Sequence, residues 1–417
     1  MLKWIALFVA LAGVWPAGVF LRNKPRLMAL LATFVGFLPY IGLDDVDINV
    51  ISFERYRGDS RGVEITLLDL AVLTFLVALP KKTRPTPLPL QRGLYFAAVV
   101  LSVAVAPLPL FAMFSVWKLA RMMIVFAVVV RVADVFVAEL VLGLGIGVLY
   151  EVFLSLKQRY LMGALRVDGN MMHPNSLAMA VNVVFPIAMA VALAQKKTRV
   201  AAIAAGGAAL LVVMSLSRGA MAMTVLAALL VYLGSALRRL DGRKLGVAVA
   251  GVLIALLVVA KAWDTLVFRF EHAAKSSEHA RVLFNAAASL MLQEHPFGVG
   301  MNQFSHVLSH FGYAARIGIP VVDRDGLAHH VYWLTAAETG WFGIASYLFL
   351  LGSPLVLAYR GAARFRDVRG DVMLGCGVSL TITYIQGTAE WIARQTAMSY
   401  LFWILSAIIC SIWRSPR

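Results

Sequence analysis

Residues 200–237 read VAAIAAGGAALLVVMSLSRGAMAMTVLAALLVYLGSAL, two apolar runs separated by a short polar break that contains Arg218. Similar runs, close to the roughly 20 residues that cross a bilayer, recur from one end of the chain to the other. Of the 417 residues, 61% are hydrophobic and only 14% are charged, whereas soluble domains carry about a quarter charged residues. Backbone groups inside lipid must pair within their own segment, and the runs lack the alternation of a β-barrel. The sequence therefore predicts an all-α, polytopic integral membrane protein.

The basic residues lie largely in short clusters between the apolar runs. A net charge of +16 would suggest nucleic-acid binding in a soluble protein, but clusters of this kind mark the cytoplasmic side of membrane helices. They lie at 22–26, 81–92, 196–199, 238–244, 360–369 and 414–417. Placing them inside predicts about 12 spans. These spans lie near residues 27–42, 66–80, 93–113, 115–131, 135–155, 176–194, 200–214, 219–237, 245–260, 331–358, 372–390 and 396–413. The first apolar segment, residues 4–21, is interpreted as retained, with its orientation left open.

The same placement predicts three parts of the chain. Residues 1–260 form a transmembrane helical bundle, residues 261–329 a long periplasmic loop domain, and residues 330–417 the C-terminal transmembrane helices. A loop of that length usually contains structure of its own or has a function. Within it, His279–Glu294 has one apolar face and predicts an amphipathic helix, with Val282, Leu283, Ala286, Ala287, Leu290 and Met291 on that face.

Histidines gather on the predicted external side. Of eight, His173 lies in the 156–175 loop, and the other seven lie in or at the end of the long loop. His329 and His330 stand where this loop enters a span. A histidine there has an unperturbed pKa near 6.5 and suits a general base, although it could instead only cap the helix. Glu338, nine residues further on, is expected either to hold an arginine or to orient the histidine, because an unpaired carboxylate in a span is costly.

Arg166, Arg218 and Arg281 are expected on the same external face. Arginine stays charged, and its planar fork matches phosphate oxygens two at a time, so three of them together favour an anionic substrate. The alternative for each is neutralisation by a structural carboxylate. Lys118 and Arg121 share one helix face; they could line a path for the same anion or extend to the membrane interface.

These motifs resemble the O-antigen ligase and O-antigen polymerase superfamily over roughly residues 150–345. The segment Arg166–Asn175 ends in Pro-Asn, as in the family, and Ser217-Arg218-Gly219 matches its Ser-Arg-Gly break. A loop helix led by Arg281 ends in His-Pro-Phe-Gly-Val-Gly at residues 295–300. His329 aligns with the family's histidine through its offset to Glu338, although His330 stands where the family usually has asparagine.

The resemblance implies a membrane glycosyltransferase of the GT-C type in the inner membrane. Such an enzyme takes a glycan from undecaprenyl pyrophosphate on the periplasmic side, with inversion. A ligase delivers it to lipid A–core, whereas a polymerase delivers it to another lipid-linked repeat. His329 would be the base, and Arg166, Arg218 and Arg281 would clamp the pyrophosphate. His330, Glu338, Lys118 and Arg121 are further candidate substrate-binding residues.

No metal or cofactor is expected. Asp323-Arg324-Asp325-Gly326 contains an Asp-x-Asp, but the same residues are typical of a turn, and the histidines lack a regular ligand spacing. A transporter or flippase for lipid-linked glycans is the alternative from another class. It would need internal repeats and paired charges deep in the spans, and neither stands out in the sequence.

Overall fold

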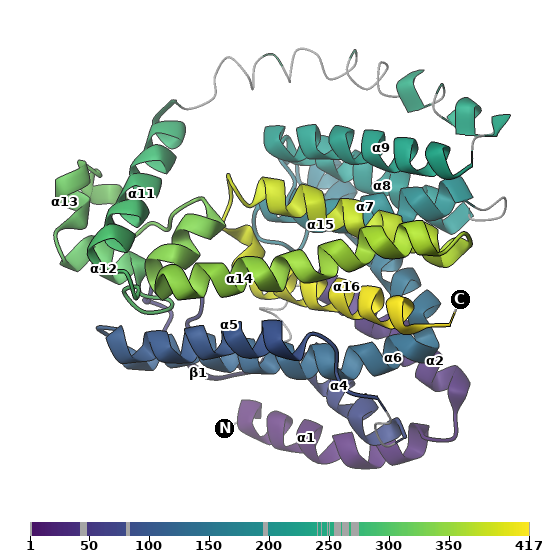
Figure 1. Ribbon diagram of the computed structural model, residues 1–417, viewed down its shortest axis with the longest axis horizontal. Helices are drawn as coiled ribbons and strands as arrows, with labels where there is room; N and C mark the ends of the chain where they lie inside the picture. Colours follow the sequence, from purple (N-terminus) through teal and green to yellow (C-terminus); the bar gives the residue numbers. More distant parts are fainter. Residues whose placement is uncertain are drawn as a thin grey trace. The chain divides into compact units, whose positions relative to one another are not determined.

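The structure is a computed structural model that describes residues 2–41, 48–80, 84–194, 199–239 and 275–416, with a few residues between 241 and 267. Half of the expected span 245–260, and residues 261–274 of the expected loop except residue 267, lie outside the described residues. The helices are α1 (Leu2–Leu21), α2 (Pro25–Phe37), α4 (Leu67–Ala78), α5 (Pro89–Ser102), α6 (Pro109–Leu156), α7 (Pro174–Ala194), α8 (Arg199–Ser215), α9 (Arg218–Arg238), α11 (Lys275–Glu294), α12 (Phe304–His310), α13 (Tyr313–Ile317), α14 (Val331–Arg364), α15 (Val368–Gln386) and α16 (Thr396–Arg414) (Figure 1). Short helical turns are η1 (Leu38–Tyr40), η2 (Val103–Val105), η3 (Lys157–Leu161), η4 (Val321–Asp323) and η5 (Ile392–Arg394).

Several helices are long and apolar enough to cross a membrane. Within the described residues they are Trp4–Leu21 of α1, α7, α9, α14 and α16, and α2, α4, α5 and α8 are shorter apolar helices. The prediction of an all-α, polytopic membrane protein is confirmed. The two expected spans 115–131 and 135–155 correspond to the two parts of α6, which meet at a kink at Phe136, where the backbone departs from helical geometry. The residues between them include no Gly or Pro that would end a helix.

The chain divides into two compact units. Unit 1 comprises Met1–Leu144, His279–Pro354 and Gly387–Pro416, and unit 2 comprises Gly145–Glu278 and Leu355–Gln386. The expected three-part division, which concerns the sides of a membrane, stays a prediction.

Unit 2 is a helical bundle in which α7 packs against α8, α9 and α15 (Figure 1). Small residues permit the close approach: a Cβ on Gly375 of α15 would lie 2.5 Å from the Ile187 Cα of α7. The buried side chain of Asn182 is paired across helices, since lipid would offer it no partner. Asn182 of α7 donates to the Ala220 carbonyl at 3.0 Å and accepts from Thr224 at 2.8 Å.

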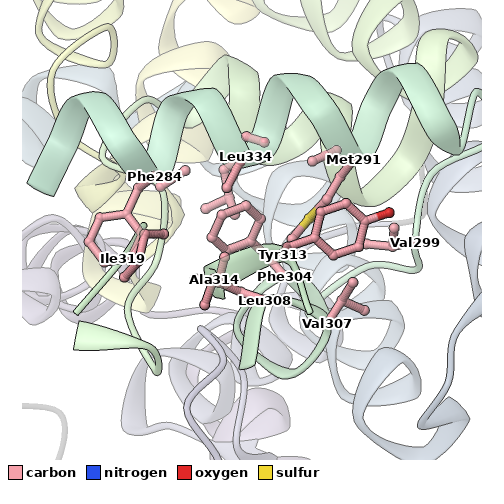
Figure 2. Packing of buried hydrophobic residues seen from close by; sticks show 14 residues of the cluster. Phe284, Met291, Val299, Phe304, Val307, Leu308, Tyr313, Ala314, Ile319 and Leu334 are labelled. Atoms are coloured by element: carbon pink, nitrogen blue, oxygen red, sulfur yellow. The ribbon is translucent and has the colours of Figure 1, made fainter. Parts of the chain in front are cut away.

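In unit 1 the expected external segment 43–65 contains a small antiparallel hairpin, formed by β1 (Ile48–Ser52) and β2 (Gly62–Ile65). The amphipathic helix expected over 279–294 is present within α11. Its Ala287 and Met291 are buried against Phe304, Leu308 and Tyr313 of α12 and α13 (Figure 2). Val282, expected on the same apolar face, is 62% exposed instead.

The helix α14 turns sharply at Gly340, which has φ 69° and ψ −171°. In a straight helix, fifteen residues would separate the Tyr332 and Tyr347 Cα atoms by about 22 Å, yet the centroids of these two rings are 6.4 Å apart. The expected span 331–358 was therefore wrong in its first part: residues 331–339, called the arm below, form a separate short helix.

The segment His295–Gly300 binds the backbone groups exposed by this turn. Val299 N donates to the Ala337 carbonyl, and Gly300 N to the Glu338 carbonyl, both at 2.9 Å. Trp341 N donates to the Pro296 carbonyl at 3.0 Å. Glycine is required for this approach, because a Cβ on Gly298 would lie 2.4 Å from the Glu338 carbonyl oxygen.

We expect Gly298→Ala to lower the melting temperature of the purified protein far more than Gly312→Ala. Both glycines have positive φ, 87° and 80°, so each alanine incurs a backbone cost of about 1–2 kcal/mol. Only Gly298 adds a collision with the backbone of the arm, since nothing lies within 4 Å of a Cβ at Gly312. Equal losses in a thermal denaturation assay would contradict the described packing.

Candidate active site

His329, two residues before the arm, faces Glu390. Its Nδ1 lies 3.6 Å from Glu390 Oε2, longer than a hydrogen bond but within ion-pair range. From the other side, Arg281 Nη2 of α11 donates to Glu390 Oε1 at 3.0 Å, and its Nη1 donates to the Ala389 carbonyl at 3.2 Å. Glu390 is buried, whereas the His329 and Arg281 side chains are 31% and 32% exposed. One buried carboxylate thus contacts both candidate residues.

This arrangement determines the ionisation of the Glu390 carboxylate and the tautomer of the His329 ring. Burial alone would raise the pKa of Glu390, but His329 and Arg281 beside it hold that pKa below its usual value. A carboxylate next to Nδ1 favours a proton on that nitrogen, so we assign the hydrogen of the neutral ring to Nδ1. The other nitrogen, Nε2, then carries the lone pair that a general base requires.

His330 has a different environment. It is the residue before α14, and its Nδ1 accepts a hydrogen bond from Trp333 N at 3.4 Å, which caps the arm. Its ring lies 5.5 Å from that of Tyr332 and 6.3 Å from that of Trp333. Burial lowers the pKa of His330 and favours the neutral ring that can accept this bond. Of the two roles foreseen for a histidine here, capping therefore describes His330.

We expect His330→Asn to keep most of the glycan-transfer activity and the thermal stability of the protein. An asparagine side-chain oxygen also accepts from the backbone at a helix start, so the cap is retained. His330→Leu removes the acceptor and should cost about 1 kcal/mol of stability. The comparison requires a thermal denaturation curve and a transfer rate for both variants; a loss of transfer in His330→Asn as large as in His329→Ala would show that His330 takes part in the chemistry.

Glu338 pairs with an arginine, one of its two expected roles, and the arginine is Arg394. Arg394 Nη1 lies 2.7 Å from Glu338 Oε2, and Glu338 Oε1 accepts from Phe304 N at 3.1 Å. The same guanidinium holds Asp59 through Nη2 at 2.9 Å and Nε at 3.2 Å. Burial alone would raise the pKa of Asp59, but Arg394 and Lys118 hold it below its usual range.

Arg121 is buried, Lys118 is partly buried, and both are paired with carboxylates of unit 1. Lys118 Nζ lies 3.7 Å from Asp59 Oδ2 and donates to the Arg394 carbonyl at 2.5 Å. Arg121 lies 3.0 Å from Glu64 Oε2 and 3.3 Å from Asp69 Oδ2. Asp69 belongs to the capping box that begins α4. Neither side chain extends to an exposed surface, and their service as an anion path stays a prediction.

Arg166 and Arg218 belong to unit 2, where two turns meet. Arg166 Nε donates to the Ser215 carbonyl at 3.1 Å, and its Nη2 donates to Asn175 Oδ1 at 3.3 Å. This ties the segment 166–175 to the break between α8 and α9. Arg218 is the first residue of α9 and is exposed. The start of a 21-residue helix carries partial positive charge, so the Arg218 guanidinium adds to a field that favours anions.

Both turns contain non-glycine residues in the left-handed region, Met172 with φ 58° and Leu216 with φ 52°. Such conformations are uncommon for these residue types and occur preferentially at functional sites. The strained Leu216 directly precedes the Ser217-Arg218 step.

The remaining motifs that were expected on the external side have local partners. His295 Nε2 lies 3.1 Å from the Tyr313 hydroxyl, which donates to Glu294 at 2.6 Å. His306 and His310 stack on each other at 4.4 Å. Asp323 ends η4 and accepts from Gly326 N at 3.0 Å, so the Asp-x-Asp forms a turn. Within the described ranges, no group of three or more His, Cys, Asp or Glu side chains could hold a metal ion.

Three residues of this site were not foreseen from the sequence: Glu390, Arg394 and Asp59. The sequence did carry a signal for the first two, because the short turn between the last two expected spans contains a carboxylate and an arginine at a membrane face, where each needs a partner. Nothing in the spacing pointed to Asp59.

A family model described as O-antigen ligase matches residues 200–348, a little over a third of the chain. The match includes Arg218, Arg281, His329 and Glu338, whereas Arg166, Lys118 and Arg121 precede it. None of the curated proteins matches the chain. The resemblance inferred from the motifs is confirmed over residues 200–348, where the chain is similar to the O-antigen ligase family, and its several apolar helices are those of a multi-pass membrane protein.

Proposed function

We propose that this chain is an O-antigen ligase of the inner membrane. It transfers O-antigen polysaccharide from undecaprenyl pyrophosphate to the lipid A–core oligosaccharide on the periplasmic side. The observation that carries the proposal is the pairing of His329 with the buried carboxylate of Glu390. An acceptor hydroxyl must lose its proton as it attacks, and a histidine held by a carboxylate is suited to accept that proton. The long 261–329 loop, in which α11, α12 and α13 share a core, favours a ligase over a polymerase.

In the proposed reaction His329 Nε2 accepts the proton of the acceptor sugar hydroxyl. The hydroxyl oxygen attacks the anomeric carbon of the donor sugar from the face opposite the pyrophosphate. The bond between that carbon and the pyrophosphate oxygen breaks, the anomeric configuration inverts, and undecaprenyl pyrophosphate leaves with the electron pair. Glu390 stabilises the imidazolium that forms, as an ionised carboxylate beside Nδ1 does.

The leaving group gains negative charge, and arginines are proposed to stabilise it. Arg166 and Arg218 lie at neighbouring turns of unit 2, and the start of α9 supports an anion there. Arg281 is already paired with Glu390. In the proposed mechanism Arg281 therefore holds Glu390 in addition to contacting the donor.

No metal ion is required in this mechanism. We expect transfer in the presence of EDTA to proceed at the same rate as without it, because guanidinium groups supply the positive charge that a divalent ion would otherwise provide. Initial rates should be compared with and without EDTA, followed by addition of Mg²⁺ or Mn²⁺. A loss of activity that either ion restores would refute the arginine clamp as the main source of charge stabilisation.

The function itself is tested by reconstitution. Purified protein in proteoliposomes is mixed with undecaprenyl-pyrophosphate-linked glycan and lipid A–core, and the core band is followed on a gel. A shift of that band establishes the ligase. Extension of the lipid-linked glycan without a shift would establish the polymerase instead. If folded protein and verified substrates give neither product, a transport assay for the lipid-linked glycan becomes the next test.

A further inference from the structure

Behind the His329–Glu390 pair lies a buried ion cluster of Arg394, Asp59, Glu338 and Lys118. Two acidic and two basic groups balance each other, which is the condition under which buried charges are tolerated. The Arg394 side chain is 7% exposed and also donates to Met301 Sδ at 3.6 Å. The Asp59 and Glu338 side chains are 5% and 1% exposed, so these residues and Arg394 act through the segments that they hold together.

The ion cluster holds the turn that contains Glu390. This turn, residues 387–395, is fastened to the arm at two points. At its start, Val331 N donates to the Gly387 carbonyl at 2.9 Å. At its end, Arg394 is paired with Glu338 at 2.7 Å. Glu390 lies between these points, and His329 lies two residues before the arm, so the two fastenings fix the separation of the histidine from its carboxylate.

We propose that Arg394 is a positioning residue that sets the contact between Glu390 and His329 without touching the substrate. The inference rests on the proposed function for the role of His329. Arginine is specifically suited to this position, because it takes both Asp59 oxygens with Nη2 and Nε while it takes Glu338 with Nη1. A lysine ammonium keeps the charge but cannot match both carboxylates in this planar geometry.

A double-mutant cycle distinguishes positioning from general structural support. We expect Arg394→Lys to lower kcat about tenfold with little change in KM for the donor. In a Glu390→Gln background the same substitution should change kcat by less than about twofold, because the contact that it positions is already lost. Equal factors in both backgrounds would overturn the inference. Arg316→Lys is the matched control. Arg316 pairs with Glu294 in the same unit at 2.5 Å, but its side chain is 50% exposed and it is not one of the proposed catalytic or binding residues.

A second readout does not depend on transfer activity. The rate at which diethyl pyrocarbonate modifies His329 at pH 6, measured by mass spectrometry, reports how firmly the ring is held by Glu390. We expect Arg394→Lys and Glu390→Gln each to raise this rate at least about threefold, because His329 Nδ1, buried beside Glu390, becomes accessible to the reagent when that contact loosens. Arg316→Lys should leave it unchanged. An unchanged rate in folded Arg394→Lys would overturn the inference.

The two proposals fail in different ways. If the wild type makes neither glycan product but the modification rates change as expected, the proposed function is wrong and the positioning role stands. If Arg394→Lys does not fold, as judged by its elution and melting curve, Glu338→Gln replaces it. That variant removes one fastening, leaves Arg394 paired with Asp59, and should raise the modification rate of His329 in the same direction.

Discussion

His329→Ala is expected to lower the rate of glycan transfer by about 10²–10⁴-fold, the range for loss of a general base. The loss should lie in kcat, with KM for the lipid-linked donor close to that of the wild type, because the proton is transferred only as the acceptor hydroxyl attacks. Initial rates of the core-band shift at saturating acceptor, with the donor concentration varied, separate the two constants.

His310→Ala is the matched control for this substitution. His310 is an exposed histidine of unit 1 whose Nδ1 lies 3.0 Å from the His306 carbonyl of its own helix, so its loss should leave both constants unchanged. Glu390→Gln should give an intermediate loss, since the ring keeps a neutral hydrogen-bonding neighbour but loses the charge that stabilises the imidazolium. A His329→Ala protein that transfers glycan at the wild-type rate would move the base elsewhere, with His330 as the first candidate.

The class of fold was predictable because it depends on hydropathy summed over the whole chain. Every apolar run, such as 176–194, adds to the same conclusion, and α7 occupies Pro174–Ala194 almost as expected. The sharp turn at Gly340 was not predictable from the same property. The residues on both sides of it are apolar, and hydropathy does not distinguish one long span from an arm followed by a span. Only a glycine with positive φ, stabilised by a distant segment, decides between them.

The candidate site was predictable in its bases but not in its acids. Histidine and arginine at an expected external face are unusual enough to attract attention, whereas their partners come from distant segments. Glu338 was the acid expected to orient His329 or to hold an arginine, yet nine residues of helix would place it about 13 Å from the histidine. Glu390, about 60 residues away in sequence, is the carboxylate that faces the ring. Spacing along the sequence shows only the order of the elements. The pairing of His329 with Glu390 depends on how those elements pack.

Arg218→Ala is expected to lower kcat by about 10²–10³-fold, the range for removing one group that stabilises charge in the transition state. Arg218 is exposed at the start of α9, next to the turn that Arg166 holds through Ser215. Its charge therefore adds to the helix field at a position suited to a leaving pyrophosphate. Arg218→Lys should retain part of the rate, because an ammonium supplies charge without the planar fork. Arg369→Ala, which removes a partly exposed arginine paired with Asp367 in the same unit, should have no effect.

How the loss in Arg218→Ala divides between kcat and KM tests the proposed role of Arg218 as sharply as the size of the loss does. Negative charge on the pyrophosphate grows as the glycosidic bond breaks, so a group that stabilises it acts more strongly on the transition state than on the bound donor. A lower kcat in Arg218→Ala, with a smaller change in KM, follows from that argument. A higher KM with an unchanged kcat would mean that Arg218 binds the donor equally before and during reaction. The stabilisation of the leaving group would then fall to Arg166 or Arg281, and the same pair of constants measured for their alanine variants would identify which.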